Sequence, residues 1–196
     1  MIEVEIDEPA WTKALPDATA LAEQAAVAAL SCVIPDGPQD RSGTQGTGRA
    51  ALGPGASPSL SSGRPPAGPG GYGRDDDGIS ASLVILLTDD AAVQDLNVRF
   101  RGQDKPTNVL SFPAGPNPED HLGDLALAFG VCAAEAKAQG KTLADHLRHL
   151  TIHGVLHLLG YDHEIDSEAE AMEALERRIL DGLGVADPYA AERDVN

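Results

Sequence analysis

The chain has few cysteines, few aromatic residues and no long apolar run, and each scarcity excludes a class of protein. Cys32 and Cys132 are the two cysteines among 196 residues, which excludes a disulfide framework and a cluster of thiolate metal ligands. Aromatic residues make up 4%, too few for extended platforms on which nucleic-acid bases stack. No apolar run approaches the roughly 20 residues that span a bilayer. We therefore expect a protein of a reducing compartment, the cytoplasm, with no membrane partner.

Basic residues are also scarce. The chain has 14 basic and 31 acidic residues, a formal charge of −17, which argues against general nucleic-acid affinity. Its acidic start lacks the basic region of a signal peptide. The block 99–148 is neutral while both flanks are acidic, so a local cationic groove and ordinary surface charges both remain open there. The cations of this block are Arg99, Arg101, Lys105, Lys137, Lys141 and Arg148.

One segment differs in composition from the rest. Residues 36–77 contain 11 glycines and 6 prolines and almost no large apolar side chain. Such a segment buries too little surface to offset its ordering entropy, so we expect a low-complexity, disordered insertion. Hydrophobic residues make up 42% of the whole chain, enough for a core. We therefore predict a single domain over 1–196 that contains the insertion.

The hydrophobic pattern of the remaining chain predicts an α+β fold, a small mixed β-sheet packed with about five helices. The apolar run 79–88 indicates a strand covered on both faces. Ser167 with Glu170 three positions later indicates a capping box at the start of the last helix. The predicted strands are 2–7, 79–88, 109–112 and 125–129, and the predicted helices are 17–32, 90–100, 131–139, 142–159 and 167–183.

Three histidines near the end of the longest apolar helix are the strongest chemical signal. His153 and His157 are four residues apart, so their rings project from one helix face. Gly160 then permits a turn at positive φ that brings His163 back toward that face. Three imidazoles suit one Zn²⁺ ion and leave its fourth position open. Nitrogen ligands also bind nickel, copper or iron. His146 and His149 share the same helical stripe, as partners of the ligand histidines, as substrate contacts, or as ordinary core or surface residues.

The spacing of the three histidines equals that of the H-E-x-x-H-x-x-G-x-x-H metalloproteases. Those enzymes use the glutamate beside the first histidine as general base. Gly154 occupies that position here and has no side chain. A general base contributes about 10²–10⁴ in rate, so its loss weakens the peptidase interpretation.

The segment 153–163, His-Gly-Val-Leu-His-Leu-Leu-Gly-Tyr-Asp-His, resembles the signature of the bacterial YbeY family of endoribonucleases and rRNA maturation factors. Residues 96–113, Leu122-Gly123-Asp124 and the acidic helix 168–176 resemble further blocks of that family. The resemblance extends from about 80 to 180, and the insertion precedes both functional blocks.

The resemblance implies one zinc ion held by His153, His157 and His163, and a functional role for Arg101. A guanidinium can bind two phosphoryl oxygens as negative charge develops on them, whereas a salt bridge to Asp104 is the plain alternative. Asp124 and Asp162 are each either a turn residue or an acceptor for the second N–H of a ligand histidine.

The family implies a single-strand-specific, metal-dependent endoribonuclease in rRNA processing, at the 3′ end of small-subunit rRNA, and in ribosome quality control. Its expected partners are rRNA, the small ribosomal subunit and assembly factors. Two alternatives remain: a metallohydrolase of another class, such as a peptidase, or a ribosome assembly factor with a structural zinc. A fourth protein ligand would support the latter, because structural zinc is four-coordinate.

Overall fold

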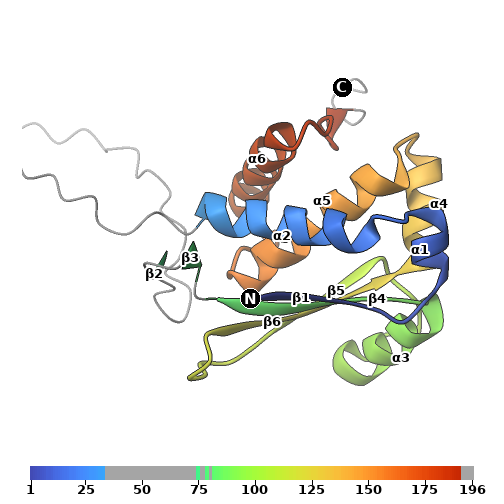
Figure 1. Ribbon diagram of the computed structural model, residues 1–196, viewed down its shortest axis with the longest axis horizontal. Helices are drawn as coiled ribbons and strands as arrows, with labels where there is room; N and C mark the ends of the chain where they lie inside the picture. The colour runs from blue at the N-terminus through green and yellow to red at the C-terminus, as the bar shows by residue number, and fades with distance from the viewer. Residues whose placement is uncertain (34–73, 76–77, 80, 191–196) are drawn as a thin grey trace, which may run out of the picture.

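The computed structural model describes residues 1–33, 74–75, 78–79 and 81–190. Within these ranges it contains a four-stranded sheet, a two-stranded hairpin and six helices. Figure 1 shows helices on both sides of the larger sheet. The α+β class predicted from the sequence is confirmed.

The larger sheet is mixed, as predicted. It consists of β1 (Ile2–Ile6), β4 (Ser82–Thr88), β6 (His121–Ala128) and β5 (Val109–Pro113), in that spatial order. β4 is parallel to both β1 and β6, and β5 closes one edge antiparallel to β6. The apolar run of β4 therefore lies in the interior of the sheet, where both of its neighbours supply backbone hydrogen bonds.

The chain around the predicted insertion differs from expectation in one respect. The strand predicted to start at residue 79 begins at Ser82, and Ile79 belongs to a separate strand. That strand, β3 (Gly78–Ile79), pairs antiparallel with β2 (Arg74–Asp75). Apart from β2, the predicted insertion 36–77 lies outside the described residues.

Helices cover the two faces of the sheet through different side chains. Alternate residues of a strand point to opposite faces, and those of β6 divide accordingly. Leu125 and Leu127 pack in the main core with α2 (Ala18–Val33) and α5 (Leu143–Leu158), whereas Ala126 belongs to a smaller cluster under α3 (Asp90–Arg101). In Figure 1, α3 accordingly lies across the sheet from α2 and α5.

Three further helices complete the described fold. They are α1 (Ala10–Ala14), α4 (Phe129–Ala138) and α6 (Asp166–Gly182). The sequence analysis did not predict α1, which contains the fully buried Trp11. The Trp11 indole Nε1–H donates to the Thr88 carbonyl at 3.1 Å, so this short helix joins the end of β4. None of the helices among the described residues is long and apolar enough to cross a bilayer.

Side-chain caps mark the starts of α3 and α5 but not of α6. The Asp89 carboxylate accepts the Ala92 N–H at 2.7 Å, and the Thr142 hydroxyl accepts the Asp145 N–H at 3.0 Å. The predicted cap at Ser167 is wrong. Helix α6 begins one residue earlier, because the Ile165 carbonyl already accepts the N–H groups of residues 168 and 169, and no side chain caps it.

Candidate metal centre

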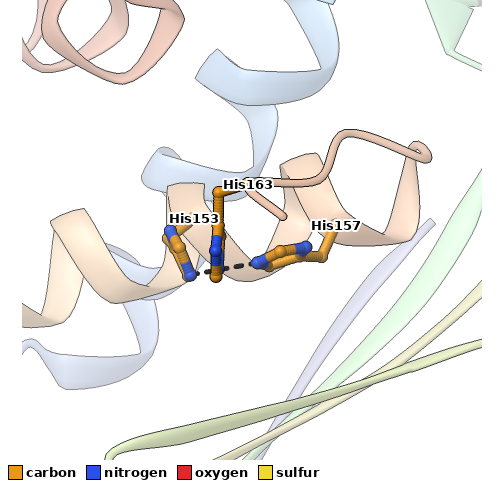
Figure 2. Close-up of side chains that lie close together, drawn as sticks. All are labelled: His153, His157 and His163. Atoms are coloured by element: carbon orange, nitrogen blue, oxygen red, sulfur yellow. Dashed lines mark hydrogen bonds between the residues drawn. The ribbon is translucent and has the colours of Figure 1, made fainter. Parts of the chain in front are cut away.

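Helix α5 presents His153 and His157 on one face, one turn apart. Both side chains are half-buried, and their Nε2 atoms lie 3.1 Å from each other. Figure 2 shows the two rings on the same side of α5, with these nitrogens facing across a short gap. The i, i+4 spacing therefore produces the convergence that the sequence predicts.

The turn after α5 brings the third imidazole into the group. Gly160 adopts φ 87°, which suits glycine, and its N–H donates to the His157 carbonyl at 3.0 Å. The Tyr161 N–H donates to the Leu156 carbonyl at 3.0 Å, which completes a Schellman motif. The His163 ring centroid then lies 5.0 Å from that of His157. Figure 2 shows His163 reaching the other two rings from the loop.

The three histidines can together hold one ion. Each offers a ring nitrogen, and the three nitrogens lie within 4.8 Å of one another. No other histidine, cysteine or carboxylate of the described residues joins this group. Three protein ligands with one position left over are characteristic of catalytic zinc sites.

The hydrogen bonds at Nδ1 of His153 and of His157 indicate which nitrogen of each ring carries the proton. His153 Nδ1 lies 2.8 Å from Glu176 Oε1, and His157 Nδ1 lies 3.0 Å from the Tyr161 carbonyl oxygen. A carbonyl and an ionised carboxylate only accept, so both Nδ1 atoms donate. In the neutral rings, both Nε2 atoms then carry lone pairs that face each other.

Electrostatics favour the neutral ring at His157. Burial, followed by the neighbouring His153 and His163 rings, lowers the pKa of His157 to about 4. A proton is therefore a poor bridge between the two lone pairs at neutral pH. A metal cation accepts both, so the donor set fits a resident metal.

Glu176 of α6 belongs to the surroundings of the candidate centre and was not singled out by the sequence analysis. Its carboxylate contacts His153 and His149 and is fully buried. Burial raises the pKa of this carboxyl, but hydrogen bonds from His149, His153 and Tyr189 and the electrostatic effect of His153 together lower the pKa to about 2. The available signal was a glutamate within the apolar stripe of α6, between Met172 and Ile179.

The two carboxylates proposed from sequence as partners of ligand histidines lie elsewhere. Asp124 is exposed, and its Oδ1 is 3.1 Å from Nε2 of His121, which is not one of the converging rings. Asp162 Oδ1 accepts the His163 backbone N–H at 2.7 Å, so Asp162 orders the turn. Neither carboxylate forms a hydrogen bond with a ring of the His153–His157–His163 group.

The two remaining histidines of the α5 stripe have carboxylate partners. His149 Nε2 lies 3.2 Å from Glu176 Oε2, which links this ring to His153 through one carboxylate. His146 is buried, and its Nε2 lies 2.9 Å from Glu135 Oε2 of α4. His149 therefore belongs to the surroundings of the candidate centre, whereas His146 joins α5 to α4.

The structure does not bring Arg101 into the group of converging histidines. It is the last residue of α3, which packs on the opposite face of the sheet from α5. Its side chain is exposed and has no hydrogen bond or ion pair with another described residue. The alternative salt bridge to Asp104 does not form, and the Asp104 carboxylate accepts from Gln94 Nε2 at 2.7 Å instead.

Gly154 packs closely against the sheet. A Cβ atom at this position would lie 2.8 Å from Leu125 Cδ2 of β6. Leu125 is itself buried in the main core. A glutamate beside the first histidine, as in the metalloprotease pattern, would therefore displace Leu125.

Comparison with known proteins then decides the family. The family model described as "Endoribonuclease YbeY" matches residues 75–184. The chain belongs to the YbeY family. The match contains the converging histidines together with Arg101 and Glu176.

Curated relatives carry the same description. An Endoribonuclease YbeY of Paramagnetospirillum magneticum is 44% identical over 97% of this chain and 96% of its own length. One of Rhodopseudomonas palustris is 57% identical over 62% of this chain and 77% of its own length. A solution structure from Thermotoga maritima covers 94% of this chain and 92% of its own, at 19% identity and a TM-score of 0.47.

Proposed function

We propose that this YbeY-family protein is a single-strand-specific, zinc-dependent endoribonuclease that processes rRNA. Its proposed roles are maturation of the small-subunit rRNA 3′ end and ribosome quality control, in the cytoplasm. The observation that carries the proposal is the convergence of three ring nitrogens within 4.8 Å of one another. The relatives named as endoribonucleases supply the substrate class.

In this proposal, His153, His157 and His163 hold the ion and Arg101 binds the substrate. When bound, zinc supplies a Lewis acid that polarises a phosphoryl oxygen and lowers the pKa of a coordinated water. The Arg101 guanidinium, exposed and unpaired within the described residues, offers a fork of N–H donors to two phosphoryl oxygens. Because α3 and α5 pack on opposite faces of the sheet, this role requires the bound RNA to reach both the histidines and Arg101. The guanidinium would then stabilise the negative charge that develops as the phosphodiester is cleaved.

The proposed partners come from the YbeY family, and the charge of the chain gives a reason why RNA binding would need them. Phosphate contacts dominate RNA affinity, and this chain carries a formal charge of −17. We therefore propose that it meets rRNA on the small ribosomal subunit, together with assembly factors that contribute to binding. Isolated RNA would be bound weakly.

Gly154 disfavours the peptidase alternative, because the position beside the first histidine holds no glutamate to act as general base. The group of three histidines disfavours a purely structural zinc. Structural sites use four protein ligands, and the described residues supply three at this point.

The test is cleavage of an unstructured, end-labelled RNA beside an unstructured peptide, before and after chelation and zinc re-addition. His157→Ala should remove both zinc and RNA cleavage. His121→Ala is the matched control, because His121 is a half-buried histidine paired with Asp124 outside the converging group. It should keep both properties.

Two results would contradict the proposal. The first is full RNA cleavage by metal-free His157→Ala purified free of contaminating nucleases. The second is cleavage of the peptide alone. A structural zinc would instead be revealed if chelation unfolded the protein, as judged by circular dichroism, and zinc-loaded protein left RNA intact.

A further inference from the structure

Glu176 is a buried carboxylate surrounded by three donors. Its Oε1 lies 2.8 Å from His153 Nδ1, and its Oε2 lies 3.2 Å from His149 Nε2. The Tyr189 hydroxyl also donates to Oε2. The side chain of Glu176 is 1% exposed, whereas that of His153 is 25% exposed. The carboxylate thus lies behind the ligand ring, away from solvent.

A buried charge destabilises the fold unless it has partners, so the hydrogen bonds of the Glu176 carboxylate decide its effect. An isolated buried carboxylate is strongly destabilising unless hydrogen bonds satisfy its oxygens. Here both oxygens accept, and the donors come from α5 and from the segment that follows α6. With both oxygens engaged, the carboxylate has little freedom to rotate. It is therefore a rigid acceptor rather than a mobile surface charge.

A rigid acceptor at Nδ1 determines which nitrogen of His153 is available to an ion. The neutral imidazole has one N–H and one lone pair, and an acceptor at Nδ1 places the proton there. The lone pair then resides on Nε2, which faces Nε2 of His157 at 3.1 Å. Without this acceptor, the proton could occupy Nε2 and block the ligand atom.

The segment after α6 helps to hold this arrangement. Tyr189 reaches Glu176 from beyond the helix end, and its ring lies edge-on to His149 with centroids 5.6 Å apart. The same segment is tied back at Pro188, whose carbonyl accepts from Lys141 Nζ at 2.7 Å. Tyr189 thus contacts both the Glu176 carboxylate and the His149 ring that shares this carboxylate with His153.

We propose that Glu176 is a positioning residue of the metal centre: its carboxylate, held by Tyr189 and His149, fixes His153 as the Nδ1–H tautomer with Nε2 directed at the ion. This inference rests on the proposed metal site. Outer carboxylates that accept from ligand histidines increase metal affinity, and their loss typically costs about 10- to 100-fold. The acceptor at His157 Nδ1 is instead the Tyr161 backbone carbonyl, not a carboxylate.

The experiment compares Glu176→Gln with Glu135→Gln in the full-length chain. Glu135 makes the equivalent contact to His146 at 2.9 Å, on the same helix α5 but outside the converging group. Zinc affinity is measured by competition with a chromophoric chelator, and the melting temperature of each apoprotein is recorded. We expect Glu176→Gln to weaken zinc binding about 10- to 100-fold and Glu135→Gln to leave it unchanged.

Two further measurements cover the case in which Glu176→Gln does not fold. Tyr189→Phe retains the carboxylate and removes one of its donors, so a weakening of about two- to tenfold is expected. Long-range ¹⁵N–¹H correlation spectra of the apoprotein report the His153 tautomer directly. We expect Nδ1–H in the parent and a mixed population in the Glu176 variant, or in Tyr189→Phe to a smaller extent.

The proposal is overturned if folded Glu176→Gln binds zinc as tightly as the parent, or if the parent His153 is predominantly Nε2–H. Unchanged affinity and tautomer in Tyr189→Phe would overturn the part assigned to Tyr189. Failure of the proposed function is a separate outcome. A parent that binds zinc but does not cleave RNA leaves this inference intact, because its readouts are affinity and tautomer.

Discussion

Gly154 of α5 packs so closely on Leu125 of β6 that a Cβ atom would approach Leu125 Cδ2 to 2.8 Å. Both residues are buried. A side chain at 154 would therefore require Leu125 to shift, directly beside the histidine at 153 in α5.

Gly154→Ala should destabilise the protein by about 1–3 kcal/mol, because Leu125 is buried in the main core and must shift to admit the added methyl group. Gly182→Ala is the control, since nothing lies within 4 Å of a Cβ at that position in α6. Replacing a helical glycine without a clash should be neutral or stabilising by up to about 1 kcal/mol. Urea denaturation measures both, and equal stability of the two variants would contradict the packing argument.

Arg101→Ala should lower RNA cleavage by about 10²–10³-fold while zinc affinity and melting temperature stay unchanged. The reason is that Arg101 has no intramolecular partner among the described residues to lose. Arg99→Ala is the matched control, because Arg99 pairs with Asp95 at 2.7 Å on the exposed side of the same helix. If both variants lose activity equally, the effect is general charge rather than a specific phosphate contact.

Thr142→Ala should destabilise the protein by about 1 kcal/mol, because its hydroxyl accepts the Asp145 N–H at the start of α5. Ser167→Ala should change the free energy of unfolding by less than about 0.5 kcal/mol, since Ser167 is exposed and lies inside α6. Denaturation midpoints at constant slope test the pair. A larger loss at Ser167 would restore the capping box predicted from sequence.

The two cysteines should differ sharply in reactivity. Burial, followed by the charges of Glu135 and Asp90, raises the pKa of the Cys132 thiol far above its usual value. A higher pKa leaves less thiolate at a given pH, so Cys132 should react with a disulfide reagent at pH 8 only after unfolding. Cys32 is half-buried and should react in the native protein. The Cys32→Ala variant tests this, and a fast-reacting thiol in it would contradict the prediction.

The sequence predicted those parts of the fold that depend on local pattern. Alternation revealed the first strand, and the glycine after α5 marked the end of that helix. Helix α1 was missed because its five residues are too few for a period, and Trp11 is held by a carbonyl of β4. The start of β6 at His121 was missed because Gly123 and Asp124 are poor strand formers, and pairing with β4 and β5 overrides their preference.

In the candidate site, too, local spacing was predictable from the sequence, whereas contacts between separate helices were not. His153, His157 and His163 converge through one helix and one turn, so their spacing contains the geometry. Glu176 comes from another helix, and which carboxylate lies behind His153 depends on how α6 packs against α5. Of the two alternatives left open for Asp124, the partner of a ligand histidine is not observed, because β6 places this carboxylate beside His121.

The glycine turn at Gly160 has a consequence for how the site would release an ion. His153 and His157 are fixed to one packed helix, whereas His163 is exposed and follows the turn. Helix fraying costs more than a swing of a surface loop, so His163 is the ligand whose departure is cheapest. We therefore expect loss of the ion to a chelator to begin with dissociation of His163, while His153 and His157 remain bound to the ion longest.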